Sequence, residues 1–308
     1  MKREFYYPSR DGETKIHAVE WLPEGKPCAV LQICHGMCEY IDRYDAFARF
    51  LNEHGFVVVG NDHLGHGQSV QSDDMHGFFC GKDGNLTVLK DLHRLRCITK
   101  RRYPDIPYFW LGHSMGSFLT RQYIARCGDG LAGVIIMGTG SQPEAALLAG
   151  KALCRALAAV HGWHYRSDLV NGMSLGSYNR HFEPGRTKCD WLTKDTQIVD
   201  AYVQDPWCTF VFTLNGYYNL FKSIEDAQDP VVIRNIPEDL PMFLVSGLED
   251  PVGDFGRGVG TAYRRYRGAS IHSDRSMRLY ENDRHEILNE TDRTQIYEDL
   301  LGWMQMRM

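Results

Sequence analysis

Residues 112–116, which read GHSMG, combine a residue type and a spacing that are well suited to chemistry. An apolar run at 108–111 precedes them, and an amphipathic pattern at 115–126 follows. This setting predicts a sharp turn from a strand into a helix, where glycines two positions before and after the serine remove side chains that would clash. Such a turn presents the Ser114 hydroxyl outward as a nucleophile, next to the positive end of the following helix.

A serine hydroxyl is a weak nucleophile at neutral pH, so we expect a histidine within hydrogen-bond reach and a carboxylate that orients it. In enzymes built on this turn, the acid follows a late strand and the histidine comes near the end of the chain. Asp250 follows the apolar run 242–245, and His285 follows a predicted last strand at 277–280. We therefore predict that Asp250 and His285 act together with Ser114.

Other side chains compete for these roles. Glu249, Asp254 and Asp283 are the rival acids, and Asp254 is the fallback because it lies in the same loop as Asp250. His113 is adjacent to the serine, and its side chain should leave the turn in a different direction. We therefore expect His113 to be a packing residue.

Acyl transfer also needs hydrogen-bond donors for a tetrahedral oxyanion, and loss of one donor typically costs about 3 kcal/mol in the transition state. The backbone amide of Met115, the residue after the nucleophile, is the first predicted donor. The amide of Met37, in the loop after the first core strand, is the second. Gly36 lets this loop bend, and the two methionine side chains are expected in the wall of a binding pocket.

Short runs rich in Val, Ile and Leu alternate with amphipathic stretches, which is the pattern of a mostly parallel sheet with helices on both faces. The predicted core strands are 29–34, 56–60, 108–111, 134–137 and 242–245. The predicted crossover helices are 42–53, 86–100, 115–126 and 287–304. Segments 5–7 and 15–22 alternate and predict an antiparallel pair before the parallel sheet.

Far more chain lies between the strands at 134–137 and 242–245 than one crossover requires. The surplus begins with a helical pattern at 145–160 and ends in an aromatic segment. We interpret about 142–221 as a helical cap inserted over the sheet, since insertions at the carboxyl ends of such strands usually serve binding. A helical pair that only lengthens the core is the alternative.

The length and composition of the chain favour one α/β domain over residues 1–308, with a core of 1–141 and 222–308. A formal net charge of -5 argues against nucleic-acid binding, because neutralising phosphates needs clustered Lys and Arg. The nine cysteines form no C-x-x-C pair and the first residues are not apolar, so we expect a reducing, cytoplasmic setting.

Neither a metal nor a cofactor is expected. The histidine pairs 63/66 and 161/164 have no further ligands at metal-binding spacing. No window approaches the roughly 20 apolar residues that span a bilayer, so any membrane contact is expected to be peripheral.

Four segments together resemble the monoacylglycerol lipase and lysophospholipase family, also called the serine aminopeptidase S33 group of α/β-hydrolases. These are HGM at 35–37 with Glu39 and Arg43, NDHLGHGQS at 61–69, GHSMG at 112–116, and RHEILNE at 284–290. The resemblance extends to 186–192 and 250–253 and covers nearly the whole chain.

The resemblance implies an α/β-hydrolase fold with Ser114, Asp250 and His285 as the catalytic triad and the two methionine amides as the oxyanion hole. The sequence departs from the common family pattern at Leu64, where an arginine often stands, and at Cys38, where glycine is frequent. Both departures lie in loops that border the expected oxyanion site, so they affect the fit of the substrate.

The apolar cap residues Leu148, Trp207 and Phe210 are expected to line a tunnel for an acyl chain, since each buried methylene contributes about 0.8 kcal/mol. The helix at 145–160 carries only Lys151 and Arg155 as charges, so it suits a membrane or micelle surface, with a buried cap helix as the alternative. The predicted substrate is a monoacylglycerol or lysophospholipid. Alternatives are a general carboxylesterase, a serine aminopeptidase, or a catalytically silent binding protein.

Overall fold

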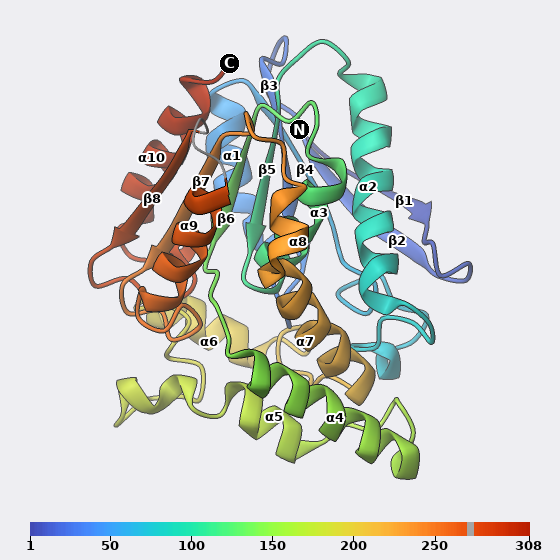
Figure 1. Cartoon of the computed structure of the whole chain (residues 1–308). Helices are drawn as coiled ribbons and strands as arrows, with labels where there is room; N and C mark the ends of the chain where they lie inside the picture. The colour runs from blue at the N-terminus through green and yellow to red at the C-terminus, as the bar shows by residue number, and fades with distance from the viewer. Residues whose placement is uncertain (270–273) are drawn as a thin grey trace.

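The computed structural model describes residues 1–269 and 274–308. Within these residues, the chain folds around an eight-stranded sheet with the strand order β1-β2-β4-β3-β5-β6-β7-β8 (Figure 1). The strands are β1 (Lys2–Pro8), β2 (Lys15–Trp21), β3 (Ala29–Cys34), β4 (Phe56–Asn61), β5 (Tyr108–His113), β6 (Gly133–Met137), β7 (Met242–Gly247) and β8 (Arg275–Tyr280). β2 pairs antiparallel with β1 and β4, and the remaining pairs are parallel. The predicted mostly parallel sheet, with its antiparallel N-terminal pair, is confirmed.

The central strands are buried along their whole length, which explains their continuous apolar sequences. The register brings Cys34 beside Gly112 and His113 beside Met137. The carboxyl ends of β3, β5 and β6 therefore lie level with one another, next to Ser114.

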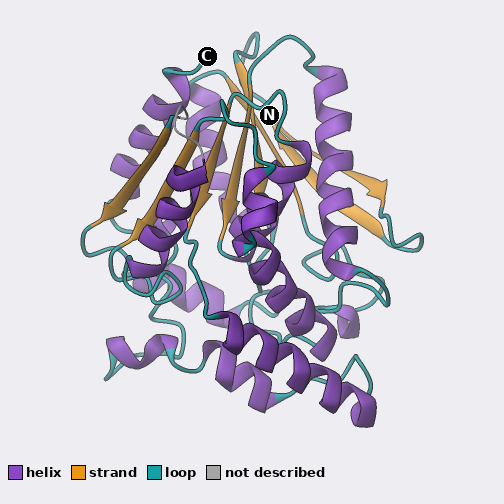
Figure 2. Ribbon diagram, in the orientation of Figure 1, coloured by secondary structure: helices purple, strands orange, loops and turns teal. Residues whose placement is uncertain are grey.

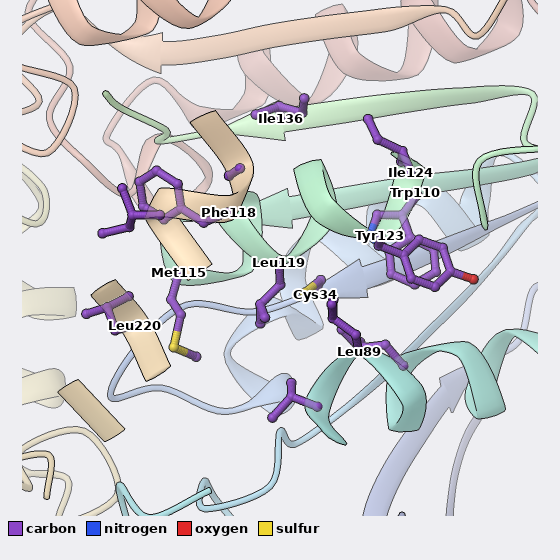
Figure 3. Packing of buried hydrophobic residues seen from close by; sticks show 14 of the residues in the cluster. Cys34, Leu89, Trp110, Met115, Phe118, Leu119, Tyr123, Ile124, Ile136 and Leu220 are labelled. Carbon is purple, nitrogen blue, oxygen red and sulfur yellow. The ribbon is translucent and has the colours of Figure 1, made fainter. Parts of the chain in front are cut away.

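Helices cover both faces of the sheet, as predicted (Figure 2). One face carries α1 (Asp45–Glu53) and α10 (Arg293–Gln305), and the other carries α2 (Gly84–Arg102), α3 (Met115–Cys127) and α9 (Arg257–Ala269). Figure 3 shows part of the second layer, where Met115, Phe118 and Leu119 of α3 lie among buried apolar side chains. The apolar layer on this face therefore extends to the helix that follows the serine.

Two helices begin later than predicted. The segment predicted as helix 42–53 starts with a 3₁₀ turn at Ile41–Tyr44 before α1. The segment predicted as helix 287–304 starts with a 3₁₀ turn at Ile287–Asn289, and α10 begins only at Arg293. The buried carboxylate of Glu290 explains the second difference, because it accepts backbone N–H groups from residues 284 and 194 and holds this stretch as a loop.

The chain between β6 and β7, which we call the inserted segment, is helical. It contains α4 (Glu144–His161), α5 (Asp168–Leu175), a 3₁₀ helix (Tyr178–Phe182), α6 (Thr196–Gln204), α7 (Leu214–Gln228) and α8 (Pro230–Arg234). Its helices α4, α5 and α6 lie beyond the carboxyl ends of the parallel strands (Figure 1). α7 continues unbroken through residue 221, where the predicted cap ends, and packs against both α3 and α4.

All nine cysteines are free thiols. In the part of the chain that the structure describes, no helix is long and apolar enough to cross a membrane. Over the same residues, no three His, Cys, Asp or Glu side chains gather into a group able to hold a metal ion. The cohesion of the fold comes from its two apolar layers on either side of the sheet.

Candidate active site

Ser114 lies at the turn from β5 into α3, as the glycine spacing predicts. Its backbone has φ 52° and ψ -120°, a conformation that is strained for any residue with a side chain. The Ser114 N–H donates to the carbonyl of Met137 over 3.0 Å, and its own carbonyl accepts the hydroxyl of Ser117 over 2.6 Å. These bonds hold the strained turn in place.

The two glycines of the turn are required by close backbone packing. A Cβ atom on Gly116 would collide with the carbonyl oxygens of Cys34 and His35. One on Gly112 would collide with the side chain of Thr120. The turn therefore presses against β3 and α3, which explains the spacing seen in the sequence.

The structure brings Asp250 and His285 together, although they follow different strands. His285 Nδ1 lies 3.0 Å from Asp250 Oδ1 in a hydrogen bond, and both side chains are buried. Asp250 also accepts the Val252 N–H and the Ser246 hydroxyl, each over 2.9 Å. Burial alone would raise the pKa of Asp250, but His285 and these hydrogen bonds outweigh it and place the pKa below its ordinary value. The ionised carboxylate can thus orient the imidazole.

The three rival acids are engaged elsewhere. Asp254 is ion-paired with Arg257 at 2.8 Å on the surface, and Asp283 bonds to Lys194 at 2.6 Å. Glu249 lies 4.0 Å from Arg284. Asp250 is therefore the carboxylate that the structure places on His285.

Ser114 and His285 line the same cavity, which has a volume of about 520 Å³. Most of its buried wall is apolar and is contributed by α3 and by the inserted segment, including α7. This part includes Met115, Phe118, Leu192, Leu220 and Ile224. Exposed polar residues, Asp168 and Lys188 among them, also line it. The cavity thus combines a mostly apolar buried wall with exposed polar residues, and Ser114 and His285 are part of its lining.

Of the predicted binding residues, Met37, Met115 and Phe210 line this cavity. Gly36 lies directly beside the nucleophile, since a Cβ atom on it would approach the Ser114 Cβ to 3.0 Å. The next residue but one, Cys38, has φ 52°, in the left-handed region that favours glycine, which explains why glycine is frequent at this position and why cysteine adopts this backbone at a cost. The predicted oxyanion loop therefore lies against the serine.

Leu148 and Trp207 are not brought to the cavity, contrary to expectation. Leu148 is 49% exposed because α4 buries a different face, which includes Leu147 and Cys154. Trp207 packs edge-on against Tyr40 with ring centroids 5.2 Å apart. The sequence predicts that the inserted segment is rich in apolar residues, but it does not predict which face of α4 packs inward.

Four charged side chains form a buried network against His285. Arg43 binds both oxygens of Glu286 at 2.7 Å and reaches Glu39 at 3.2 Å. His113 Nδ1 lies 3.1 Å from Glu39, and its Nε2 lies 3.3 Å from the carbonyl oxygen of His285. His113 was expected only to pack, and the structure corrects this: each of its nitrogens has a polar partner.

Each charged group of this network stabilises the charged form of its oppositely charged neighbours. Burial alone would lower the pKa of His113, but its hydrogen bond to Glu39 and the charges of Glu39 and Glu286 raise it. The pKa of Glu39 lies well below its ordinary value, since His113 and Arg43 outweigh the effect of its burial. The sequence held one signal of this network, the i, i+4 spacing of Glu39 and Arg43.

Comparison with known proteins agrees with the fold. The family model described as serine aminopeptidase S33 matches residues 25–292. Monoglyceride lipase of Mus musculus is 26% identical over 294 residues, covering 94% of this chain and 86% of the relative. Monoacylglycerol lipase of Mycolicibacterium smegmatis is 23% identical over 300 residues, covering 95% of this chain and 94% of the relative.

A solved structure, a thermostable carboxyl esterase from Bacillus coagulans in complex with glycerol, superposes with a TM-score of 0.92 at 28% identity. The match covers 99% of this chain and 98% of the esterase. The family match extends from before β3 to the loop that precedes α10, and it includes the serine turn, the acid loop and the histidine loop. The chain therefore belongs to the serine aminopeptidase S33 family of hydrolases.

Proposed function

We propose that this protein is a serine hydrolase that cleaves carboxylic esters of long acyl chains, with monoacylglycerols and lysophospholipids as its substrate class. One observation carries the proposal: the strained Ser114 and the hydrogen-bonded pair of His285 and Asp250 meet at a large cavity with an apolar interior. The monoglyceride lipase relatives support the same class of substrate.

In the proposed reaction, the Ser114 hydroxyl oxygen attacks the ester carbonyl carbon while His285 takes the hydroxyl proton. Asp250 keeps the proton on Nδ1 of His285, so that Nε2 is free to act as the base. The amides of Met37 and Met115 hold the oxyanion, aided by the positive end of α3. His285 then gives the proton to the departing alcohol, and water cleaves the acyl-enzyme by the same steps.

The cavity supports a long acyl chain rather than a short one. Its buried apolar wall, with Phe118, Leu220 and Ile224, offers a site where each methylene gains about 0.8 kcal/mol on leaving water. The polar groups of Asp168 and Lys188 lie on exposed residues and suit the head group. Acyl chain and head group would thus occupy opposite ends of one cavity.

A peptidase that removes amino-terminal residues would need a free carboxylate for the substrate ammonium. Glu39 and Glu286 both line the cavity, but Arg43 and His113 already neutralise them. This pairing leaves no free charge on the two buried carboxylates that line the cavity, and the exposed Asp168 is the carboxylate that a substrate ammonium would have to use.

We also propose peripheral contact with a lipid surface through the inserted segment. Leu169 and Met173 of α5 are 59% and 65% exposed, and α5 also contributes Asn171 and Leu175 to the cavity wall. An apolar helix face beside the cavity would let a lipid enter without crossing water. Replacing both Leu169 and Met173 with Glu should reduce co-sedimentation with phosphatidylcholine vesicles, whereas Val231→Glu, 58% exposed on α8, should not.

The substrate proposal is tested with p-nitrophenyl esters of two to sixteen carbons and with monooleoylglycerol. We expect kcat/KM to rise with chain length, and fluorophosphonate labelling to disappear in Ser114→Ala. Equal rates across the series would contradict the acyl-chain assignment. Rapid cleavage of an aminoacyl anilide without esterase activity would instead support the peptidase.

A further inference from the structure

Trp191 of the inserted segment lies against the imidazole of His285. The two ring centroids are 5.1 Å apart, with 39° between the ring planes. Trp191 also lines the cavity that contains Ser114. An aromatic side chain from outside the core therefore contacts the proposed general base.

The backbones of the two segments are joined as well. The His285 N–H donates to the Trp191 carbonyl over 3.4 Å, and the Glu286 N–H donates to the Leu192 carbonyl over 2.7 Å. Arg284 donates to the carbonyl of Asp190 over 2.5 Å. Three successive residues of the histidine loop are thus fastened to the stretch that carries Trp191.

Trp191 has a second set of contacts, with the chain that precedes it. Its ring packs edge-on against Tyr178 with centroids 5.0 Å apart, and the backbone N–H of Trp191 donates to the Asn179 side-chain oxygen over 3.1 Å. Both partners belong to the 3₁₀ helix that precedes Trp191 in the chain. The 3₁₀ helix therefore contacts both the backbone and the ring of Trp191.

Several charged and polar groups surround His285. Asp250 favours its positive form from the loop after β7, whereas the ring of His113, at the end of β5, lies 4.7 Å away and is paired with Glu39. Glu286 is neutralised by Arg43, and burial raises the pKa of Tyr178 to about 12, so Tyr178 is uncharged at neutral pH. Asp250 thus faces the imidazole directly, the neighbouring His113 is compensated by Glu39, and the aromatic ring of Trp191 offers further stabilisation.

We propose that Trp191 is a positioning residue that stabilises the imidazolium of His285. The inference rests on the proposed role of His285 as the general base. The negative face of an indole attracts a cation within about 6 Å of its centroid, and the observed separation satisfies this. Because the imidazolium forms when the serine proton is transferred, this contact is stronger in the transition state than in the resting enzyme.

The test compares Trp191→Leu, which keeps apolar bulk without an aromatic face, with Trp191→Phe, which keeps a weaker one. In protein labelled with ¹³C-histidine, NMR titration gives the pKa of His285, whose signal is identified by its loss in His285→Gln. We expect the pKa to fall by about half a pH unit in Trp191→Leu and by less in Trp191→Phe. Trp163→Leu, which removes an indole packed on Tyr218, should leave it unchanged.

Kinetics with p-nitrophenyl acetate, whose acyl group is too short to depend on the cavity wall, provide the second measurement. The acid limb of the kcat/KM profile should shift by the same amount, and kcat should fall about two- to five-fold in Trp191→Leu with partial recovery in Trp191→Phe. An unchanged His285 pKa in both variants overturns the proposal, even if activity falls, because Trp191 would then act only as cavity wall.

Failure of the proposed function is recognised separately. It would appear as a wild-type protein without esterase activity and without fluorophosphonate labelling, whereas the NMR titration does not depend on turnover. If Trp191→Leu does not fold, Trp191→Phe alone tests the proposal. A lower His285 pKa in this variant supports the proposal, and an unchanged pKa overturns it.

Discussion

Arg43 can be removed to test whether the buried network supports the histidine loop. Its side chain bonds to both Glu39 and Glu286, and both carboxylates are buried. Arg43→Met keeps the aliphatic length and removes the charge. Breaking a buried ion pair by removing one partner costs about 3–5 kcal/mol, because the other charge is left without compensation. Glu39 retains His113 and the Tyr44 hydroxyl, so the cost falls mainly on Glu286.

The stability lost in Arg43→Met should depend on pH. In the wild type, burial alone would raise the pKa of Glu286, but Arg43 outweighs it, so the pKa lies below the ordinary value of 4.5. This contribution to stability is fully present above the unfolded pKa and is lost as pH falls through the folded pKa. Without Arg43, burial should raise the pKa of Glu286 above 4.5, and protonation then relieves the buried charge. The variant's deficit should therefore shrink as pH falls toward 4.5.

Urea unfolding followed by tryptophan fluorescence measures the effect. We expect Arg43→Met to lower the free energy of unfolding by about 3–5 kcal/mol at pH 7.5, with a smaller deficit at pH 5. The double variant Arg43→Met, Glu286→Gln removes both charges and should recover part of the loss. A deficit below about 1 kcal/mol, or one that is the same at both pH values, would refute the reasoning.

Three further variants test the site. Asp250→Asn should lower kcat for esters by about 10⁴-fold because the imidazole loses its orienting carboxylate, while Asp254→Asn should leave kcat near the wild-type value, as steady-state kinetics will show. Gly116→Ala should prevent folding or lower the Tm by several degrees, because its methyl group meets the Cys34 carbonyl; thermal unfolding by circular dichroism checks this, and an unchanged Tm counts against the packing argument. Leu220→Phe should narrow the cavity and lower kcat/KM for sixteen-carbon esters more than for two-carbon esters; equal losses would place Leu220 outside the acyl site.

The parts of the fold that the sequence predicts well are those with a local physical cause. Strands such as Phe56–Asn61 are buried on both faces and so carry continuous apolar runs. The turn at Ser114 imposes glycine at 112 and 116, and the chain order of acid and histidine follows from the sheet. These features need no knowledge of distant contacts.

The features that the sequence does not predict depend on contacts between distant segments. Arg43 and Glu286 are 243 positions apart, and no periodicity signals their pairing. The late start of α10 depends on Glu290, whose carboxylate bonds to the inserted segment. The exposure of Leu148 depends on which face of α4 docks on the rest of the protein. The sequence does not predict this face, because the whole helix is rich in apolar residues.

The junction between the inserted segment and the histidine loop limits how this enzyme can be re-engineered. Residues 190–195 accept hydrogen bonds from Arg284, His285 and Glu286 and supply donors to Glu290. The backbone that shapes the substrate cavity is thus also the backbone that steadies the base. Exchanging the insertion with that of a relative, to change the preferred lipid, would disturb proton transfer unless residues 190–195 are retained.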